Sequence, residues 1–157
     1  MTADSQKSDW NGYKSDLEID EKVMVALVKA SELFKKDCDA IFKNYGLTFS
    51  QYNVLRVVNN SQGGQNSVTN ASKIMLVSSP NLTGIAKRLE KNGFIIRKSD
   101  LKDERITLLE ITPKGKQVLK NIRKTHDDNI NDYLHSFSEE GKKRLLEDLK
   151  RVFNKSR

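Results

Sequence analysis

Hydrophobic residues recur at steps of three and four along most of the chain, a spacing that predicts amphipathic helices rather than strands. The first such stripe consists of Val23, Leu27, Ala30, Phe34, Cys38, Ile41 and Tyr45. It stops just before a glycine, which commonly ends a helix. Two more stripes, at residues 118–137 and 145–153, predict long helices near the C-terminus. These helices carry more apolar surface than a small lobe can cover, so they favour pairing with a second copy of the chain.

The segment after the first stripe predicts the start of a compact lobe. Thr48 and Gln51 have the spacing of a capping box, in which two side chains satisfy free N–H groups at a helix start. The inward-facing positions of this helix are Tyr52, Val54, Leu55 and Val58. Residues 61–67 are rich in Gly, Ser, Asn and Gln and predict an irregular connection. A short helix at residues 69–76 follows.

The next segment predicts a basic helix that begins near Ser78. Pro80 suits its first position, because the N–H group that proline lacks would be unpaired there. Four apolar residues then predict one buried stripe, namely Leu82, Ile85, Ala86 and Leu89. The opposite strip carries Pro80, Gly84, Lys87 and Lys91. Such a strip suits DNA, although solvated basic faces are also common on ordinary surface helices.

A charged hairpin follows this helix. Residues 94–97 and 106–111 are rich in β-prone residues and predict two strands. The loop between them, residues 98–105, is charged almost throughout and is expected to be mobile. Thr112 then predicts the cap of another helix. This succession predicts a winged helix-turn-helix lobe at residues 47–115.

The chain is basic, with a formal net charge of +7 and an isoelectric point of about 9.4. Net charge alone would fit DNA, an anionic membrane surface or an acidic protein. The cations gather in residues 87–105, whereas the first 21 residues are acidic. The positive field is therefore predicted at the basic helix and the hairpin, where DNA would lie.

The N-terminal residues 1–17 are polar and weakly patterned, so we expect a flexible arm. No apolar run approaches the length that a bilayer span needs, and the N-terminus lacks a signal-peptide pattern. We therefore expect a cytoplasmic protein with no membrane partner.

Several fragments of the sequence occur in the order and spacing of one known family. They are residues 47–55 before the helix-turn-helix, 88–94 at the end of the basic helix, 103–105 at the wing tip and 111–115 after it. The last two are similar to a DxR wing tip and an LTxxG helix start. From about residue 23 onward the chain resembles a MarR-type (multiple antibiotic resistance regulator) transcription factor.

The resemblance implies a mainly α fold with a small β wing, as one domain at residues 18–157. Dimerisation helices at residues 18–46 and 116–157 would flank the winged lobe. The implied function is a homodimeric, ligand-responsive repressor on a pseudo-palindromic double-stranded DNA operator. Its effector would be a small aromatic or phenolic compound, and no cofactor is implied. The chain departs from the family at Ala71 and Ser72, where Leu-Ala is usual, and at Gly84 inside the basic helix.

The predicted DNA contacts fall into three groups. Base reading is assigned to Ser79, Asn81, Thr83 and Gly84. Phosphate contacts are assigned to Lys73, Ser78, Lys87 and Arg88. Arg105 is assigned to the minor groove, with Asp103 orienting it. Glycine costs a helix up to about 1 kcal/mol relative to alanine, so a close approach to DNA is our hypothesis for Gly84.

Other chemistry finds less support in the sequence. Cys38, the single cysteine, lies on the first stripe and is expected to be a small buried hydrophobe, with redox sensing as an alternative. His126 and His135 are nine residues apart, which places them on opposite sides of a helix, so we expect no metal site. No catalytic motif is present, and we expect no enzyme. The remaining alternatives are an architectural DNA-binding protein without an effector and a protein-interaction module that has lost its operator.

Overall fold

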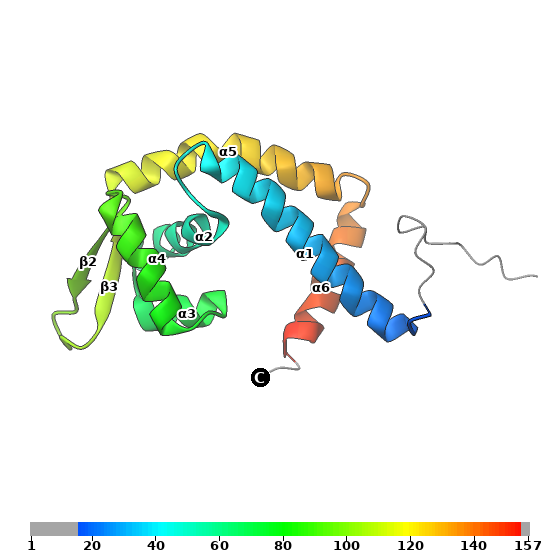
Figure 1. Ribbon diagram of the computed structural model, residues 1–157, viewed down its shortest axis with the longest axis horizontal. Coiled ribbons are helices and arrows are strands. Elements are labelled where there is room, and N and C mark those ends of the chain that lie inside the picture. The colour runs from blue at the N-terminus through cyan, green and yellow to red at the C-terminus, as the bar shows by residue number, and fades with distance from the viewer. Residues whose placement is uncertain (1–15, 155–157) are drawn as a thin grey trace, which may run out of the picture. The chain divides into compact units, whose positions relative to one another are not determined.

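The computed structural model describes residues 16–154 of the chain. Contacts divide the chain into two units, residues 1–34 and 35–157, and the first helix runs across the division. Within the described residues the structure has six α-helices and one three-stranded sheet (Figure 1). These elements confirm the predicted fold class, mainly α with a small β wing. The arm predicted at residues 1–17 lies, apart from its last two residues, outside the described residues.

Helix α1 (Ile19–Lys43) confirms the first predicted helix. It is followed by a turn at Gly46, whose φ of 73° is a left-handed conformation that glycine adopts without strain. Cys38 and Phe42 are the buried residues of α1. The predicted stripe passed through Ile41 instead of Phe42 and was wrong at this end. The Phe42 ring stacks on Tyr52 with centroids 4.0 Å apart, so contact with the next helix decides which face is buried.

Helix α2 (Phe49–Asn59) begins with the predicted capping box, in which Thr48 and Gln51 exchange hydrogen bonds. The Asp39 carboxylate of α1 also accepts the Phe49 N–H, at 2.6 Å. The four positions predicted to face inward are all buried. Through this face α2 contacts α3, α4, α5 and β3, so it forms the centre of the core of the winged lobe.

The connection after α2 contains a strand that the sequence did not predict. A 3₁₀ turn (Gln62–Gly64) leads into β1 (Gln65–Ser67), which pairs antiparallel with β3 (Thr107–Ile111). Strand β2 (Ile95–Ser99) pairs with the other edge of β3, so the strand order is β1-β3-β2. The prediction of an irregular connection was wrong because three residues carry too little periodicity to indicate a strand. Only pairing with a distant partner defines it.

The predicted helix-turn-helix consists of α3 (Val68–Met75) and α4 (Ser79–Lys91). Between the two helices Leu76 has a φ of 53°, and its N–H group donates to carbonyls in the last turn of α3. The buried residues of α4 are the predicted Leu82, Ile85, Ala86 and Leu89. Pro80 is the second residue of α4 rather than the first, and the Ser78 side chain makes no capping hydrogen bond. The position of the helix was therefore predicted correctly, but not the way it begins.

The hairpin of β2 and β3 is the predicted wing, with Ile95 paired to Ile111. Thr112 caps α5 (Pro113–Leu134) by accepting the Gly115 N–H at 3.0 Å, as predicted. Helix α6 (Glu139–Asn154) follows and contains no buried residue. Within residues 16–154, none of the helices combines the length and the hydrophobicity that a membrane span requires.

Candidate nucleic-acid interface

Helix α4 turns one face to the core and the other to solvent. Its four apolar residues are buried against α2, α3 and β2, because they share one side of a 3.6-residue period. The exposed side carries Asn81, Gly84, Lys87 and Arg88, four of the predicted DNA contacts. The core therefore fixes the rotation of α4 and leaves these positions accessible.

Two hydroxyl groups assigned to base reading already have partners within the chain. The Ser72 hydroxyl donates to the Thr69 carbonyl at 2.8 Å and lies 3.1 Å from the Ser79 hydroxyl. Since a hydroxyl has one proton, Ser79 is the donor in this second bond. Thr83 donates to the Ser79 carbonyl at 2.9 Å. Both side chains can therefore accept hydrogen bonds from DNA amino groups, whereas donation to a base acceptor would break a bond within the protein.

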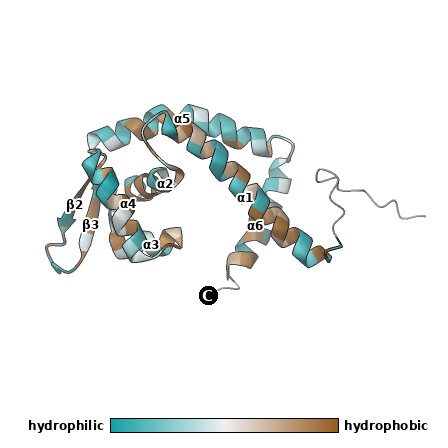
Figure 2. Cartoon of the chain, in the orientation of Figure 1, coloured by the Kyte–Doolittle hydropathy of each residue, from teal (hydrophilic) through white to brown (hydrophobic). Residues whose placement is uncertain are grey.

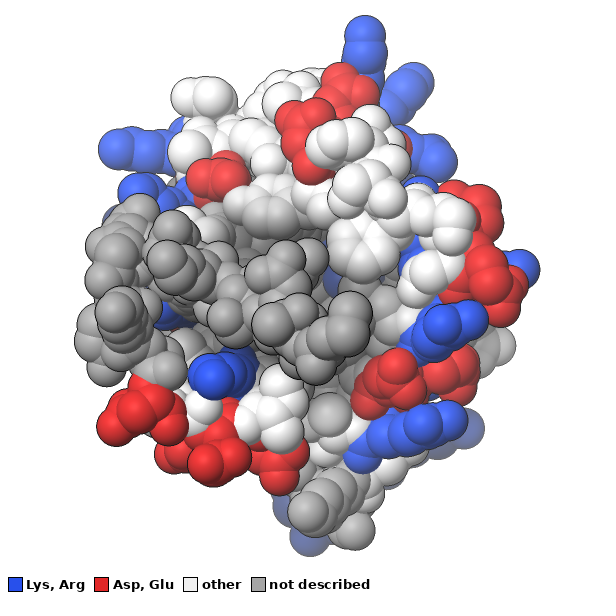
Figure 3. Space-filling model, turned by 90° about the vertical axis from the view of Figure 1, so that its right-hand side faces the viewer, with Lys and Arg blue, Asp and Glu red and all other residues white. Residues whose placement is uncertain are grey.

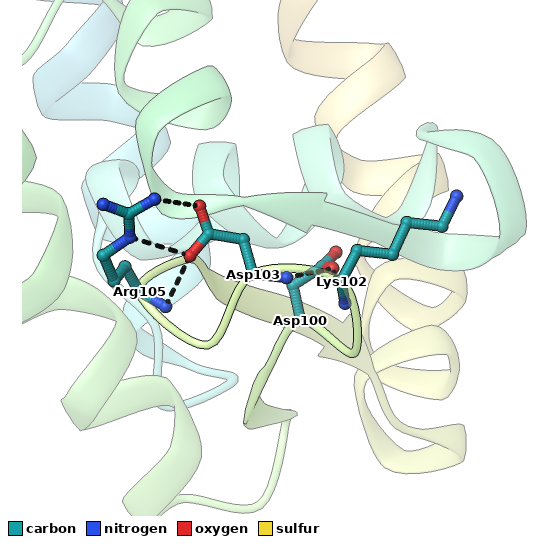
Figure 4. Close-up of polar contacts among 4 residues, drawn as sticks. All are labelled: Asp100, Lys102, Asp103 and Arg105. Carbon is teal, nitrogen blue, oxygen red and sulfur yellow. Dashed lines mark hydrogen bonds and ion pairs between the residues drawn. The ribbon is translucent and has the colours of Figure 1, made fainter.

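The wing loop carries an ion pair between Asp103 and Arg105 (Figure 4). The Arg105 Nε donates to Asp103 Oδ1 at 3.0 Å and Nη2 donates to Oδ2 at 3.1 Å, while the Arg105 backbone N–H also donates to Oδ1. These hydrogen bonds lower the pKa of Asp103 and raise that of Arg105. A two-point contact fixes the plane of the guanidinium group. The predicted orienting partner is therefore in place, while the role of Arg105 on DNA stays a prediction.

Two cations near the wing are held by acidic partners. Arg97 on β2 donates to Glu90 on α4 through its side chain at 2.7 Å and through its backbone N–H at 3.1 Å. This contact lowers the pKa of Glu90 and joins the end of α4, the second or recognition helix of the helix-turn-helix, to the wing. Lys98 lies in β2, not in the loop as predicted, and pairs with Glu110 on β3. These two cations have structural partners, which the sequence pattern did not indicate.

Lys73 on α3 and Lys87, Arg88 and Lys91 on α4 are the remaining cations of the helix-turn-helix. Among residues 16–154, no ion pair involves Lys73, Lys87, Arg88 or Lys91. On α6, by contrast, three cations pair with acidic neighbours one helical turn away. The face drawn in Figure 3 shows acidic and basic side chains interspersed. The cations of α3 and α4 can therefore neutralise an external polyanion without breaking an ion pair of the described residues.

The winged lobe and the helix ends that flank it match one family of transcriptional regulators. The model of the SarA/Rot transcriptional regulators matches residues 33–122, which include the end of α1, the helix-turn-helix, the wing and the start of α5. The chain belongs to the SarA/Rot family of transcriptional regulators. It is similar to the regulator SarZ of Staphylococcus epidermidis, with 27% identity over 129 residues, 82% of this chain and 84% of SarZ. It is also similar to MhqR of Bacillus subtilis, with 29% identity over 131 residues, 83% of this chain and 89% of MhqR.

Solved structures show that this SarA/Rot regulator has the MarR fold, as the sequence resemblance implied. A MarR family regulator from Streptomyces coelicolor, solved in complex with DNA, has a TM-score of 0.80 and 23% identity, covering 89% of each chain. CouR from Rhodococcus jostii, solved with p-coumaroyl-CoA, has a TM-score of 0.78 and 16% identity, covering 87% of this chain and 95% of CouR. The regulator thus has a winged helix-turn-helix fold.

The single cysteine of the regulator lies in a buried cluster. Its Sγ is 3.9 Å from Nδ1 of His126 and 3.7 Å from the side-chain nitrogen Nδ2 of Asn129. Burial, with a smaller effect of the neighbouring carboxylates of Asp37 and Asp39, raises the pKa of the Cys38 thiol to about 11. Since the thiolate is the reactive form, this environment disfavours oxidation. The structure therefore lends the redox alternative no support.

The two histidines lie in different surroundings. His126 is buried edge-on against the rings of Phe42 and Tyr52, and burial lowers its pKa. His135 is exposed at the end of α5. Within residues 16–154, no group of three or more His, Cys, Asp or Glu side chains is arranged to hold a metal ion.

Proposed function

We propose that this regulator binds a specific operator as a homodimer in the cytoplasm and changes its DNA affinity when a small molecule binds. The observation that carries the proposal is the exposed strip of α4, with its small polar residues and unpaired cations, together with the Asp103–Arg105 pair of a wing whose strand β2 contacts the same helix. The MarR fold that it shares with a regulator crystallised on DNA supports this use of the strip.

The proposed contacts on α3, α4 and the wing suit different parts of the duplex. Asn81, with Ser79 and Thr83 as acceptors, can read base edges from the first turns of α4, where Gly84 permits close approach. The cations Lys73, Lys87 and Arg88, together with the Ser78 hydroxyl, suit phosphates. Arg105 suits the adjacent minor groove, since a narrow groove has an enhanced negative potential.

Dimer formation is supported by apolar residues that the chain leaves exposed on its terminal helices. Those of α1 are Ile19, Val23, Met24, Val25, Val28 and Leu33. Those of α6 are Leu145, Leu146, Val152 and Phe153. Figure 2 shows brown, hydrophobic segments among teal ones along α1. Burial of such surface favours association at about 25 cal/mol per Å². Two-fold symmetry would then place two α4 helices roughly 34 Å apart, on successive turns of one DNA face.

An effector site is supported by a groove of about 580 Å³ between α2 and α5. The aromatic rings of Tyr52 and His126 line it, and so do the cations of Arg56 and Lys120 and the ion pair of Arg123 with Asp127. Aromatic rings beside cations suit an aromatic acid or a phenol, the class that the resemblance to MarR-type regulators implied. Release of DNA by salicylate or 4-hydroxybenzoate in wild type, with the response lost in Arg56→Ala, would support this site. A response that survives the substitution would place the effector elsewhere.

A titration tests whether the regulator recognises a sequence. The intergenic DNA upstream of its own gene and random DNA of equal length would be titrated at one fixed salt concentration. We expect a ratio of the two affinities above about a thousand, as for sequence-specific regulators. A ratio near one would instead indicate an architectural protein, and binding to neither duplex would indicate a protein-interaction module.

Gly84 offers a test in which stability and DNA affinity change in opposite directions. A Cβ atom at this position would meet no atom within 4 Å apart from the adjoining backbone of α4 and the two neighbouring residues, so the fold itself does not require glycine. We expect Gly84→Ala to raise the free energy of unfolding by up to about 1 kcal/mol, because alanine favours helix. We also expect it to weaken operator binding, because the added methyl group faces the DNA. Urea denaturation and fluorescence anisotropy measure the two effects, and an unchanged DNA affinity would contradict the proposed close approach.

A further inference from the structure

Leu101 is a fully exposed apolar side chain at the wing tip. Its relative exposure is 103%, so it buries no surface within the chain. Hydrogen bonds fix the backbone on both sides of it: Asp100 Oδ1 accepts the N–H of Lys102 at 2.7 Å, and the Asp100 N–H donates to the Ile106 carbonyl at 2.9 Å. The Ile106 N–H in turn donates to the Asp103 carbonyl at 2.9 Å. The loop therefore presents a leucine to solvent from a closed, hydrogen-bonded turn.

The charges of the loop leave little net attraction for phosphate. Asp100, Asp103 and Glu104 offset Lys102 and Arg105, so residues 100–105 carry a slightly negative formal charge. Two of the three carboxylates serve the loop itself, through the backbone of Lys102 and through Arg105. Figure 4 shows Arg105 and Lys102 extending from opposite sides of the loop. Counterion release at the tip is consequently small, and an apolar contact is the other interaction that the tip can offer.

We propose that Leu101 enters the minor groove together with Arg105 and packs against the apolar deoxyribose walls. This inference rests on the proposed DNA-binding function and adds a specificity-determining residue to it. The minor groove is about 6 Å wide and narrower still in A·T tracts, so a single leucine can contact both walls there. In a wider G·C groove it reaches one wall. Leu101 thus favours A·T base pairs under the wing without any hydrogen bond to a base.

The test compares Leu101→Ala with wild type on two 30-base-pair duplexes, one built from A·T tracts without TpA steps and one of alternating G·C pairs. We expect Leu101→Ala to weaken binding to the A·T duplex about fivefold, since part of a leucine side chain loses its burial. We expect a smaller loss on the G·C duplex. The slope of log K against log salt should stay unchanged, because no charge is removed. Leu101→Met, which keeps the apolar surface, should bind as wild type does.

Arg105→Ala, measured on the same duplexes, distinguishes failure of the Leu101 inference from failure of the DNA-binding proposal. If Leu101→Ala binds both duplexes like wild type while Arg105→Ala is weakened, Leu101 has no role and the wing contact stands. If wild type binds neither duplex at low salt, the DNA-binding proposal itself fails. A thermal melt of Leu101→Ala should match wild type, since the side chain is fully exposed. A lowered melting temperature would contradict the inference by giving Leu101 a structural role.

Discussion

Gly115→Ala is expected to destabilise the protein by about 3 kcal/mol or more, because a Cβ atom at this position has no room. It would lie 2.3 Å from the Phe94 carbonyl oxygen and 2.8 Å from the Ile111 side chain. The Phe94 carbonyl cannot move away freely, since it accepts the Thr112 backbone N–H at 3.1 Å and lies 3.0 Å from the Thr112 hydroxyl, whose single proton also faces the Gly93 carbonyl. The expected result is a melting temperature lower by about 6–12 °C, measured by circular dichroism.

The matched control for this variant is Gly84→Ala, which adds the same methyl group at an open helical position. Its melting temperature should stay the same or rise. If Gly115→Ala melts with wild type, the start of α5 is not packed against the wing as closely as the structure indicates. The same result would remove the structural explanation for glycine in the motif at residues 111–115.

Arg105→Ala is expected to have the largest effect on DNA affinity, a loss of about tenfold to a hundredfold on the operator. The side chain is exposed, and within the described residues its one ion pair is with Asp103. Its removal should therefore leave the fold intact. Anisotropy titrations at several salt concentrations should show both a weaker affinity and a shallower salt slope. Unaltered affinity and slope would contradict the role of the wing.

Asp103→Asn distinguishes orientation from charge in the same experiment. The amide keeps the shape of the side chain and removes the two-point ion pair with Arg105. We expect a loss smaller than that of Arg105→Ala, because the arginine remains but is no longer held in one plane. A loss equal to that of Arg105→Ala would show that the guanidinium group is useful only when Asp103 holds it.

The sequence predicted the recognition helix and the wing because their signals are local. The stripe from Leu82 to Leu89 follows helical periodicity, and the Thr48 and Thr112 caps depend on residues three positions away. The Asp103–Arg105 contact likewise joins residues two positions apart. Interactions over such short separations form whenever the local element forms, so they can be inferred without knowing the rest of the fold.

The candidate site was less predictable wherever it depends on distant partners. Arg97 and Lys98 belong to the same basic run as Lys87 and Arg88, yet Glu90 and Glu110 pair with the first two. Ser79 was predicted to read bases, but the Ser72 hydroxyl from α3 already engages it. No spacing rule signals these contacts, because the partners lie on different elements that meet only after folding.

The sequence by itself determined which segments become helices and hairpin, where several of them are capped, and that cations are concentrated in residues 87–105. Periodicity, capping and charge are properties of neighbouring residues, and they act before any tertiary contact forms. Only the tertiary structure decided that β1 completes the sheet, that Phe42 rather than Ile41 is buried, and which cations remain unpaired. Those outcomes depend on which surfaces come together, because burial and pairing exist only between elements that touch.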